Sequence, residues 1–163
     1  MSLKPRWNRC VYHRGEQVVP FFEDYLRSPN RQILIIGGAG FDPRSTQIAE
    51  LIVKYASERT HGFFIREDRP RPDSQLSEKG DANEKELKAA IPNTEVHHLE
   101  IFAKDDAVVG GRAAVGLITS IELLRFTDIF VDMSALSVGV AFPIVRYLDE
   151  TLREQKITIS RCR

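Results

Sequence analysis

The segment Gln32-Ile-Leu-Ile-Ile-Gly-Gly-Ala-Gly-Phe-Asp-Pro-Arg-Ser45 carries the clearest structural signal in the sequence. Gln32–Ile36 is almost wholly apolar and ends at glycine, which is typical of a strand buried on both faces of a parallel sheet. After the turn, apolar residues recur at helical spacing at Ile48, Leu51, Ile52 and Tyr55. Asp42 is suited to cap this helix and Pro43 to occupy its first position. The segment therefore predicts a strand, a glycine-rich turn and a helix.

The same alternation of strand and helix continues along the chain. Further strands are expected at Gly62–Arg66, Glu95–Phe102, Asp128–Met133 and Lys156–Ser160. Helices are expected around Asn83–Ala90, over Ala107–Leu124, and from the fourth strand through Leu152, with Pro143 in the first turn of the last one. The polar, proline-rich segment Arg66–Gly80 predicts a long loop. This order predicts an α/β fold: a Rossmann-like three-layer open sheet, mainly parallel, of about five strands with helices on both faces.

Residues 1–30 are expected to form a lead-in to this domain. Val18, Val19, Phe22 and Leu26 lie close to a helical stripe, which Pro20 interrupts, so one short helix is expected there. Residues 31–163 are expected to form the Rossmann-like domain. The chain stops shortly after the last expected strand, whereas such folds often continue into a helix or a second domain. Two alternatives stay open: a complete domain, or the amino-terminal part of a longer protein.

The composition is that of a globular protein with no excess of charge. Lys plus Arg number 23 and Asp plus Glu number 23, so the formal net charge is zero. This balance argues against duplex nucleic acid as the main partner, because binding to the phosphate backbone needs a basic surface. The sequence has no secretion signal and no apolar run of membrane-spanning length, which predicts a cytoplasmic protein without membrane contact. Cys10 and Cys162 have no metal-type spacing and are expected to be free thiols, and no metal site is expected.

The glycine turn is the strongest functional signal. Its glycines allow positive φ angles and let backbone amides approach a ligand closely. The start of the following helix favours anions, because its amide groups are unpaired and the helix dipole is positive there. The expected ligand contacts from this turn are Gly37, Gly38, Gly40, Asp42, Arg44 and Ser45, with Arg44 on a phosphate. The alternative interpretation is a tight strand-to-helix turn that binds nothing.

Parts of the turn match the dinucleotide-binding fingerprint. Gly38-Ala39-Gly40 supplies the first two glycines, but Pro43 stands where the third belongs. Glu67 and Asp68 follow the second expected strand, where an acidic residue can hold a ribose hydroxyl. The phosphate-cradling loop that ends in lysine and a hydroxyl residue is absent. A nucleotide or dinucleotide is therefore the expected ligand or cofactor, and its identity stays open.

A second polar loop, Asp132–Gly139, follows the fourth expected strand. In an open α/β sheet the ligand crevice lies where neighbouring connections leave on opposite faces. If the first and fourth strands are adjacent, this loop faces the glycine turn. Ser134 and Ser137 would then bind the ligand, and Asp132 would orient a hydroxyl or act as an acid or base. The alternative is a polar strand exit in which Ser137 caps the next helix.

This part of the chain resembles a known family. Val131-Asp-Met-Ser-Ala-Leu-Ser-Val-Gly139, followed by a small-residue helix and a terminal strand, resembles the second half of the CRISPR-associated Rossmann-fold (CARF) sensor domains. The resemblance covers Ile33–Ser160 in element order, and its specific match is Val131–Gly139; the usual glycines and lysine that follow in the family are missing here. It implies a cyclic oligonucleotide ligand across the ends of the first and fourth strands, a dimer whose two copies share one ligand, and a fused effector.

Other candidates carry weaker signals. The small-residue run Gly110–Gly116 predicts close packing of a helix on the sheet, and Arg112 near its start is a candidate contact for a ligand anion. His97 and His98 are adjacent in an expected strand, so their side chains should point to opposite faces of the sheet.

Three functions are consistent with these features. The leading hypothesis is a nucleotide-binding or nucleotide-sensing domain that takes a phosphate-bearing small molecule at the Gly37–Ser45 turn and the Asp132–Gly139 loop and acts as a homo-oligomer with an effector. The second is a small enzyme that hydrolyses the glycosidic bond of a nucleotide or NAD, with the catalytic carboxylate supplied by Asp132, Glu67 or Asp68. The third is a partner-binding scaffold without a ligand.

Overall fold

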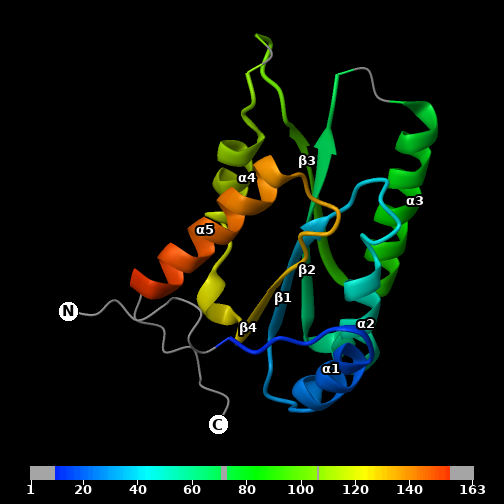
Figure 1. Ribbon diagram of the computed structural model, residues 1–163, viewed down its shortest axis with the longest axis vertical. Coiled ribbons are helices and arrows are strands. Elements are labelled where there is room, and N and C mark those ends of the chain that lie inside the picture. Colours follow the sequence, from blue (N-terminus) through cyan, green and yellow to red (C-terminus); the bar gives the residue numbers. More distant parts are fainter. Residues whose placement is uncertain (1–9, 71–72, 106, 155–163) are drawn as a thin grey trace.

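The computed structural model describes residues 10–70, 73–105 and 107–154 (Figure 1). Within these residues, four parallel strands form one sheet in the order β3-β2-β1-β4. The strands are β1 Ile33–Gly38, β2 Thr60–Asp68, β3 Asn93–Glu100 and β4 Asp128–Val131. The expected fifth strand, Lys156–Ser160, lies outside the described residues. The expected class, a Rossmann-like α/β fold with a parallel sheet, is confirmed.

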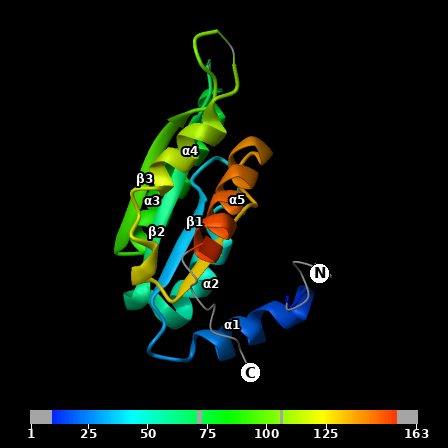
Figure 2. The same ribbon diagram turned by 90° about the vertical axis from the view of Figure 1, so that its left-hand side faces the viewer.

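Helices cover both faces of this sheet, which makes three layers (Figures 1 and 2). The helices are α1 Val18–Leu26, α2 Gln47–Ala56, α3 Ser74–Ala90, α4 Gly110–Ile118 and α5 Val138–Glu154. Short 3-10 turns lie at Gly15–Gln17, Ser57–Arg59 and Leu123–Arg125. One face packs against α1, α2 and α3, and the other against α4 and α5.

The core is divided by the sheet into two apolar clusters. Every residue of β1 is buried, because this central strand has helices on both sides. Leu34 and Ile36 of β1 pack on the side of α4 and α5, whereas Ile33 and Ile35 pack on the side of α1, α2 and α3. Complete burial of a side chain of this size stabilises the fold by roughly 1.5–3 kcal/mol. The apolar run recognised in the sequence is therefore the centre of the fold.

Helix α1 belongs to the domain core, although the sequence marks it as a lead-in. Phe22 and Leu26 are buried in the cluster that also contains β1 and α2. Pro20 is the third residue of α1, inside the first turn, where a missing amide hydrogen costs no helical bond.

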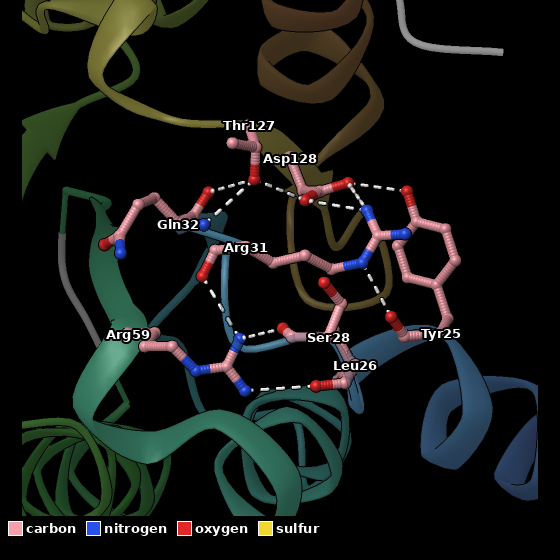
Figure 3. A network of polar contacts seen from close by, with 8 residues as sticks. All are labelled: Tyr25, Leu26, Ser28, Arg31, Gln32, Arg59, Thr127 and Asp128. Carbon is pink, nitrogen blue, oxygen red and sulfur yellow. Dashed lines mark hydrogen bonds and ion pairs between the residues drawn. The ribbon is translucent and has the colours of Figure 1, made fainter. Parts of the chain in front are cut away.

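A polar network fixes α1 to the amino edge of the sheet (Figure 3). Asp128 at the start of β4 has a side chain only 8% exposed, and Arg31 donates to both of its carboxylate oxygens at 3.0 and 3.1 Å. The hydroxyls of Tyr25 and Thr127 donate to the same carboxylate at 2.5 and 2.6 Å. The buried carboxylate is thus well supplied with donors, which indicates a structural role.

Helix α2 starts at Gln47, later than the sequence suggests. The Asp42 carboxylate accepts a hydrogen bond from the Arg44 amide at 2.9 Å, and the Ser45 amide donates to the Asp42 carbonyl at 3.0 Å. These bonds form a separate turn, so the expectations that Asp42 caps the helix and that Pro43 is its first residue are wrong.

The segment Arg66–Gly80 is not a long loop. Strand β2 continues to Asp68 because it pairs with β3 along its length, and α3 begins at Ser74. The Asp73 side chain caps α3 by accepting from the Leu76 amide at 3.1 Å. Helix α3 is mostly polar, so its apolar periodicity is too weak to be recognised beyond its last turns.

The two helices on the opposite face also differ from expectation. Helix α4 is shorter than the expected Ala107–Leu124 and ends at Ile118. Pro143 lies inside α5 rather than in its first turn, so the Gly139 carbonyl has no helical amide donor. A Cβ atom added to Gly111 of α4 would lie only 2.5 Å from that Gly139 oxygen. Gly111 therefore permits close packing of α4 on α5, whereas Gly110 permits the expected close packing beside the sheet, since a Cβ atom there would lie 3.0 Å from the Ile101 side chain directly after β3.

Candidate functional site

Strands β1 and β4 are adjacent and parallel, with Ile36 opposite Val131. Helix α2 leaves β1 on one face of the sheet, whereas α5 leaves β4 on the other. The Gly37–Ser45 turn and the Asp132–Ser137 loop therefore meet at the carboxyl ends of the strands, where the direction of the connections reverses (Figure 1). We call these two segments the switch-point site. The expected juxtaposition of the two loops is confirmed.

The glycines of the turn are required for close approach rather than for their φ angles. A Cβ atom at Gly38 would lie 2.3 Å from the Ala135 carbonyl oxygen, so the turn and the second loop are in direct backbone contact. A Cβ atom at Gly37 would lie 3.5 Å from the Asp132 Cβ atom. Among the described residues, the glycine with a positive φ angle is Gly15. The expectation of positive φ angles in the turn is therefore wrong.

Asp42 and Arg44 form an ion pair within the turn. The Arg44 Nε and Nη2 atoms donate to the Asp42 carboxylate at 2.9 and 2.6 Å. Hydrogen bonds from the side chain and the backbone of Arg44 lower the pKa of Asp42 to about 2. The pKa of Arg44 is raised mainly by Asp42, with a further contribution from the charge of Asp132. The carboxylates of Asp42 and Asp132 and the guanidinium of Arg44 thus lie close enough to influence one another.

Three backbone amides of the turn have no acceptor among the described residues. The amides of Gly40, Phe41 and Asp42 donate no hydrogen bond to any residue that the structure describes, whereas the Ala39 amide bonds to the Ile65 carbonyl at 2.9 Å. Phe41 is 47% exposed, so this part of the turn is accessible to solvent.

Asn83 of α3 forms hydrogen bonds to the Gly37–Ser45 turn. Its Nδ2 atom donates to the Gly40 carbonyl at 2.8 Å and to the Asp42 carbonyl at 3.0 Å. Because both partners are acceptors, the bonds fix which end of the amide is the nitrogen. Sequence reasoning missed Asn83, since it lies 43 residues from Gly40 and belongs to no motif.

Ser45 lies inside the protein. The residue is 2% exposed, and its buried hydroxyl has no hydrogen-bond partner among the described residues. The expected direct contact between Ser45 and a ligand disagrees with this position, because the hydroxyl is closed off from solvent.

Asp132 and Ser134 form a compact turn after β4. The Asp132 Oδ1 atom accepts from the Ser134 amide at 2.9 Å and from the Ser134 hydroxyl at 2.6 Å. The second oxygen, Oδ2, accepts no hydrogen bond from the described residues. Asp132 therefore has one oxygen that fixes its orientation and one that is available as an acceptor.

The three candidate catalytic carboxylates are not gathered at one point. Glu67 accepts from the Ser137 amide at 2.6 Å and so occupies the start of α5. Asp68 points to the other face of the sheet, where it lies 3.0 Å from His98 Nδ1. Of the three, Asp132 is the one that lies in the switch-point site.

The remaining candidates lie elsewhere. Arg112 is on the exposed side of α4, which packs against α5 rather than against the glycine turn. His97 stacks on Phe63, whereas His98 faces Asp68 and Glu84, which confirms that the two histidines point to opposite faces. Over residues 10–70, 73–105 and 107–154, no group of three or more His, Cys, Asp or Glu side chains could hold a metal ion.

Two surface hollows lie away from these loops. One of about 180 Å³ is enclosed by the end of α4, the following 3-10 turn and α5. The other, of about 410 Å³, lies beside α3 and is lined by Asp81, Glu84, Lys85, Lys88 and His98. Neither contains a residue of the switch-point site. No helix in the described part of the chain has the length and apolar character needed to cross a membrane.

Comparisons with known proteins place few constraints on the ligand. No protein-family model matches this sequence, and no curated protein matches it. Among solved structures, the chain is similar to protein Rv1636 from Mycobacterium tuberculosis H37Rv, with a TM-score of 0.40 and 15% sequence identity over 79% of this chain and 93% of that chain. A likeness of this size bears on neither ligand nor activity.

Proposed function

We propose that the protein binds a nucleotide at the switch-point site and acts as a sensor of that nucleotide. The observation that carries the proposal is the group of Gly40, Phe41 and Asp42 amides that lack acceptors among the described residues, at the carboxyl ends of the paired strands β1 and β4. Amides at such a position are fixed donors for phosphate oxygens.

The phosphate is assigned to the β1 side of the site. The start of α5 already holds the Glu67 carboxylate, which would repel a second anion. On the β1 side, the amides of the turn and the Arg44 guanidinium supply donors, and Arg44 is 59% exposed at its side chain. A phosphate would share Arg44 with Asp42.

A nucleotide suits the local charge better than free phosphate does. The two negative charges of Asp42 and Asp132 exceed the one positive charge of Arg44. The site therefore attracts free phosphate only weakly. The Oδ2 atom of Asp132, which accepts no hydrogen bond from the described residues, is an acceptor for a ribose hydroxyl, which would anchor the uncharged part of the ligand. Binding is proposed ahead of turnover because, of the three candidate catalytic carboxylates, Glu67 and Asp68 are held by Ser137 and His98, and Asp132 alone remains in the site.

Ligand-dependent thermal unfolding and calorimetric titration of the full chain test the proposal. ATP, AMP, NAD and a cyclic oligoadenylate are the probes; the last follows from the resemblance to CARF sensor domains, which also makes one ligand per two chains the expected stoichiometry. A probe at one hundred times its Kd should stabilise the fold by about 2.7 kcal/mol.

Two variants test the assigned contacts. Arg44→Ala and Asp132→Asn should each weaken binding about tenfold, because each removes one charge-assisted hydrogen bond. Arg27→Ala removes an exposed Arg–Glu pair on α1 and is the matched control. No stabilisation by any probe, or equal affinity in all three variants, would reject the site, and hydrolysis of a probe that Asp132→Asn abolishes would favour the enzyme instead.

A further inference from the structure

We infer that Asn83 is the positioning residue of the switch-point site: it fixes the Gly40–Phe41 peptide so that the Phe41 amide points toward the ligand phosphate. The inference rests on the proposed function. It starts from the two hydrogen bonds of 2.8 and 3.0 Å that Asn83 Nδ2 donates to the Gly40 and Asp42 carbonyls. No other side chain of the described residues donates to these two carbonyls.

The direction of the Phe41 amide follows from peptide geometry. A trans peptide is planar, and its N–H group points opposite to its carbonyl group. The described residues contain no cis peptide bond. Since the Gly40 carbonyl points to α3, the Phe41 amide points away from α3. The turn lies between α3 and the loop that follows β4 (Figure 1), so the Phe41 amide points to the side of that loop.

Gly40 lies on the side of that loop as well. A Cβ atom on Gly40 would lie 3.8 Å from the Ala135 carbonyl oxygen, which is the nearest atom that it would meet. Asn83 therefore holds the Gly40–Phe41 peptide through the Gly40 carbonyl, and the position of a Gly40 side chain lies 3.8 Å from the loop that follows β4.

Asn83 is itself held in place by the packing of α3 on β2. The Arg66 guanidinium lies under α3 and donates to the Ser77 carbonyl and to Asp81, both at 3.0 Å. A Cβ atom at Gly80 would lie 2.5 Å from the Arg66 Cζ atom, so α3 sits directly on this group. One turn further along the helix, Asn83 reaches the glycine turn. The register of α3 thus sets the position of the Asn83 amide.

Loss of Asn83 should weaken the binding of a ligand that carries a phosphate, but not of a ligand that lacks one. Without a donor for its carbonyl, the Gly40–Phe41 peptide is free to rotate and can present an oxygen to the phosphate instead of an N–H group. A phosphate would then meet a repulsive dipole in place of a preorganised donor. A ligand without phosphate would not experience this change.

The first test needs no ligand. Backbone ¹⁵N relaxation of the full chain should give order parameters near 0.85 for Phe41 and Asp42 in the wild type and below about 0.6 in Asn83→Ala. Asn83→Asp keeps the size of the side chain but removes the donor, so it should give the same loss. Asn93→Ala, at the start of β3 on the other edge of the sheet, is the control and should give wild-type values. Unchanged order parameters in both Asn83 variants would overturn the inference.

The second test uses AMP and adenosine as probes. Asn83→Ala should weaken AMP about tenfold and leave adenosine unchanged, since one phosphate hydrogen bond is lost. Equal weakening of both probes would reveal a merely structural role and overturn the inference. If the wild type binds neither probe nor any nucleotide named above, the proposed function fails, and the order parameters still decide whether Asn83 holds the turn.

Discussion

The carboxylate of Glu67, at the end of β2, accepts a hydrogen bond of 2.6 Å from the backbone amide of Ser137, 70 residues later in the chain. The contact crosses the end of β1 and ties β2 to the start of α5. Gly38 makes room for it on the same face of the sheet, because the Ala135 carbonyl takes the space that a side chain would need. An internal carboxylate therefore occupies the helix start that an outside anion could have used.

Replacement of Glu67 should lower stability through this contact. Glu67→Ala leaves the Ser137 amide without its acceptor, and the expected loss is about 1 kcal/mol, as for removal of a helix cap. Urea unfolding followed by circular dichroism measures the difference. Glu150→Ala removes an exposed carboxylate further along α5 that pairs with Arg146, and its effect should stay within about 0.5 kcal/mol. Equal effects of the two variants would contradict the role given to Glu67.

The glycines of the fold should respond differently to alanine. Gly38→Ala places a Cβ atom 2.3 Å from a backbone oxygen and should destabilise the protein by about 1–3 kcal/mol. Gly116→Ala meets no atom within 4 Å on α4 and should stabilise it by up to about 1 kcal/mol. Thermal unfolding of the two variants measures the difference, and a stable Gly38→Ala protein would show that the two loops do not touch.

Asp128 should be the most sensitive polar position at the amino edge of the sheet. Asp128→Ala leaves Arg31, which is 24% exposed at its side chain, without its carboxylate partner. Because removal of one partner of a buried pair costs about 3 kcal/mol, a loss of similar size is expected in urea unfolding. Glu23→Ala breaks an exposed pair with Arg27 on α1 and serves as the control. A loss as small as that of the control would argue against the network in Figure 3.

The Asp42–Arg44 pair predicts a distinct acid titration. The pKa of Asp42 is lowered from 3.8 to about 2 by hydrogen bonds from Arg44, so the folded state favours the ionised carboxylate. The contribution of this pair to folding is therefore present above about pH 4 and is lost as the pH falls toward 2. The carboxyl ¹³C shift of Asp42 should titrate near pH 2 in the wild type and near 3.8 in Arg44→Ala. Arg146→Ala should leave the midpoint unchanged, and a wild-type midpoint near 3.8 would refute the pairing.

Much of the fold could be predicted from local sequence. The apolar run at β1, the alternation of strands and helices, and the opposite directions of His97 and His98 all depend on residues that are near neighbours in the chain. Helix α3 could not be recognised at its full length, because a mostly exposed helix needs few apolar positions.

The two segments of the candidate site could be located from local sequence, but the contacts of their residues could not be predicted. Sequence reasoning found the Gly37–Ser45 turn and the Asp132–Gly139 loop at the ends of the correct strands. It also made Ser45 a ligand contact and Glu67 a candidate catalytic carboxylate, whereas Ser45 is buried and Glu67 bonds to Ser137. It gave no indication of Asn83.

The sequence by itself determined that the chain is an α/β protein with a glycine-rich turn after its central strand, because backbone conformation follows from side-chain periodicity and turn chemistry over a few residues. Only the tertiary structure decided which polar groups in the turn keep a free donor or acceptor. That outcome depends on strand order and helix register, which bring Asn83 to Gly40 and Glu67 to Ser137 from far along the chain.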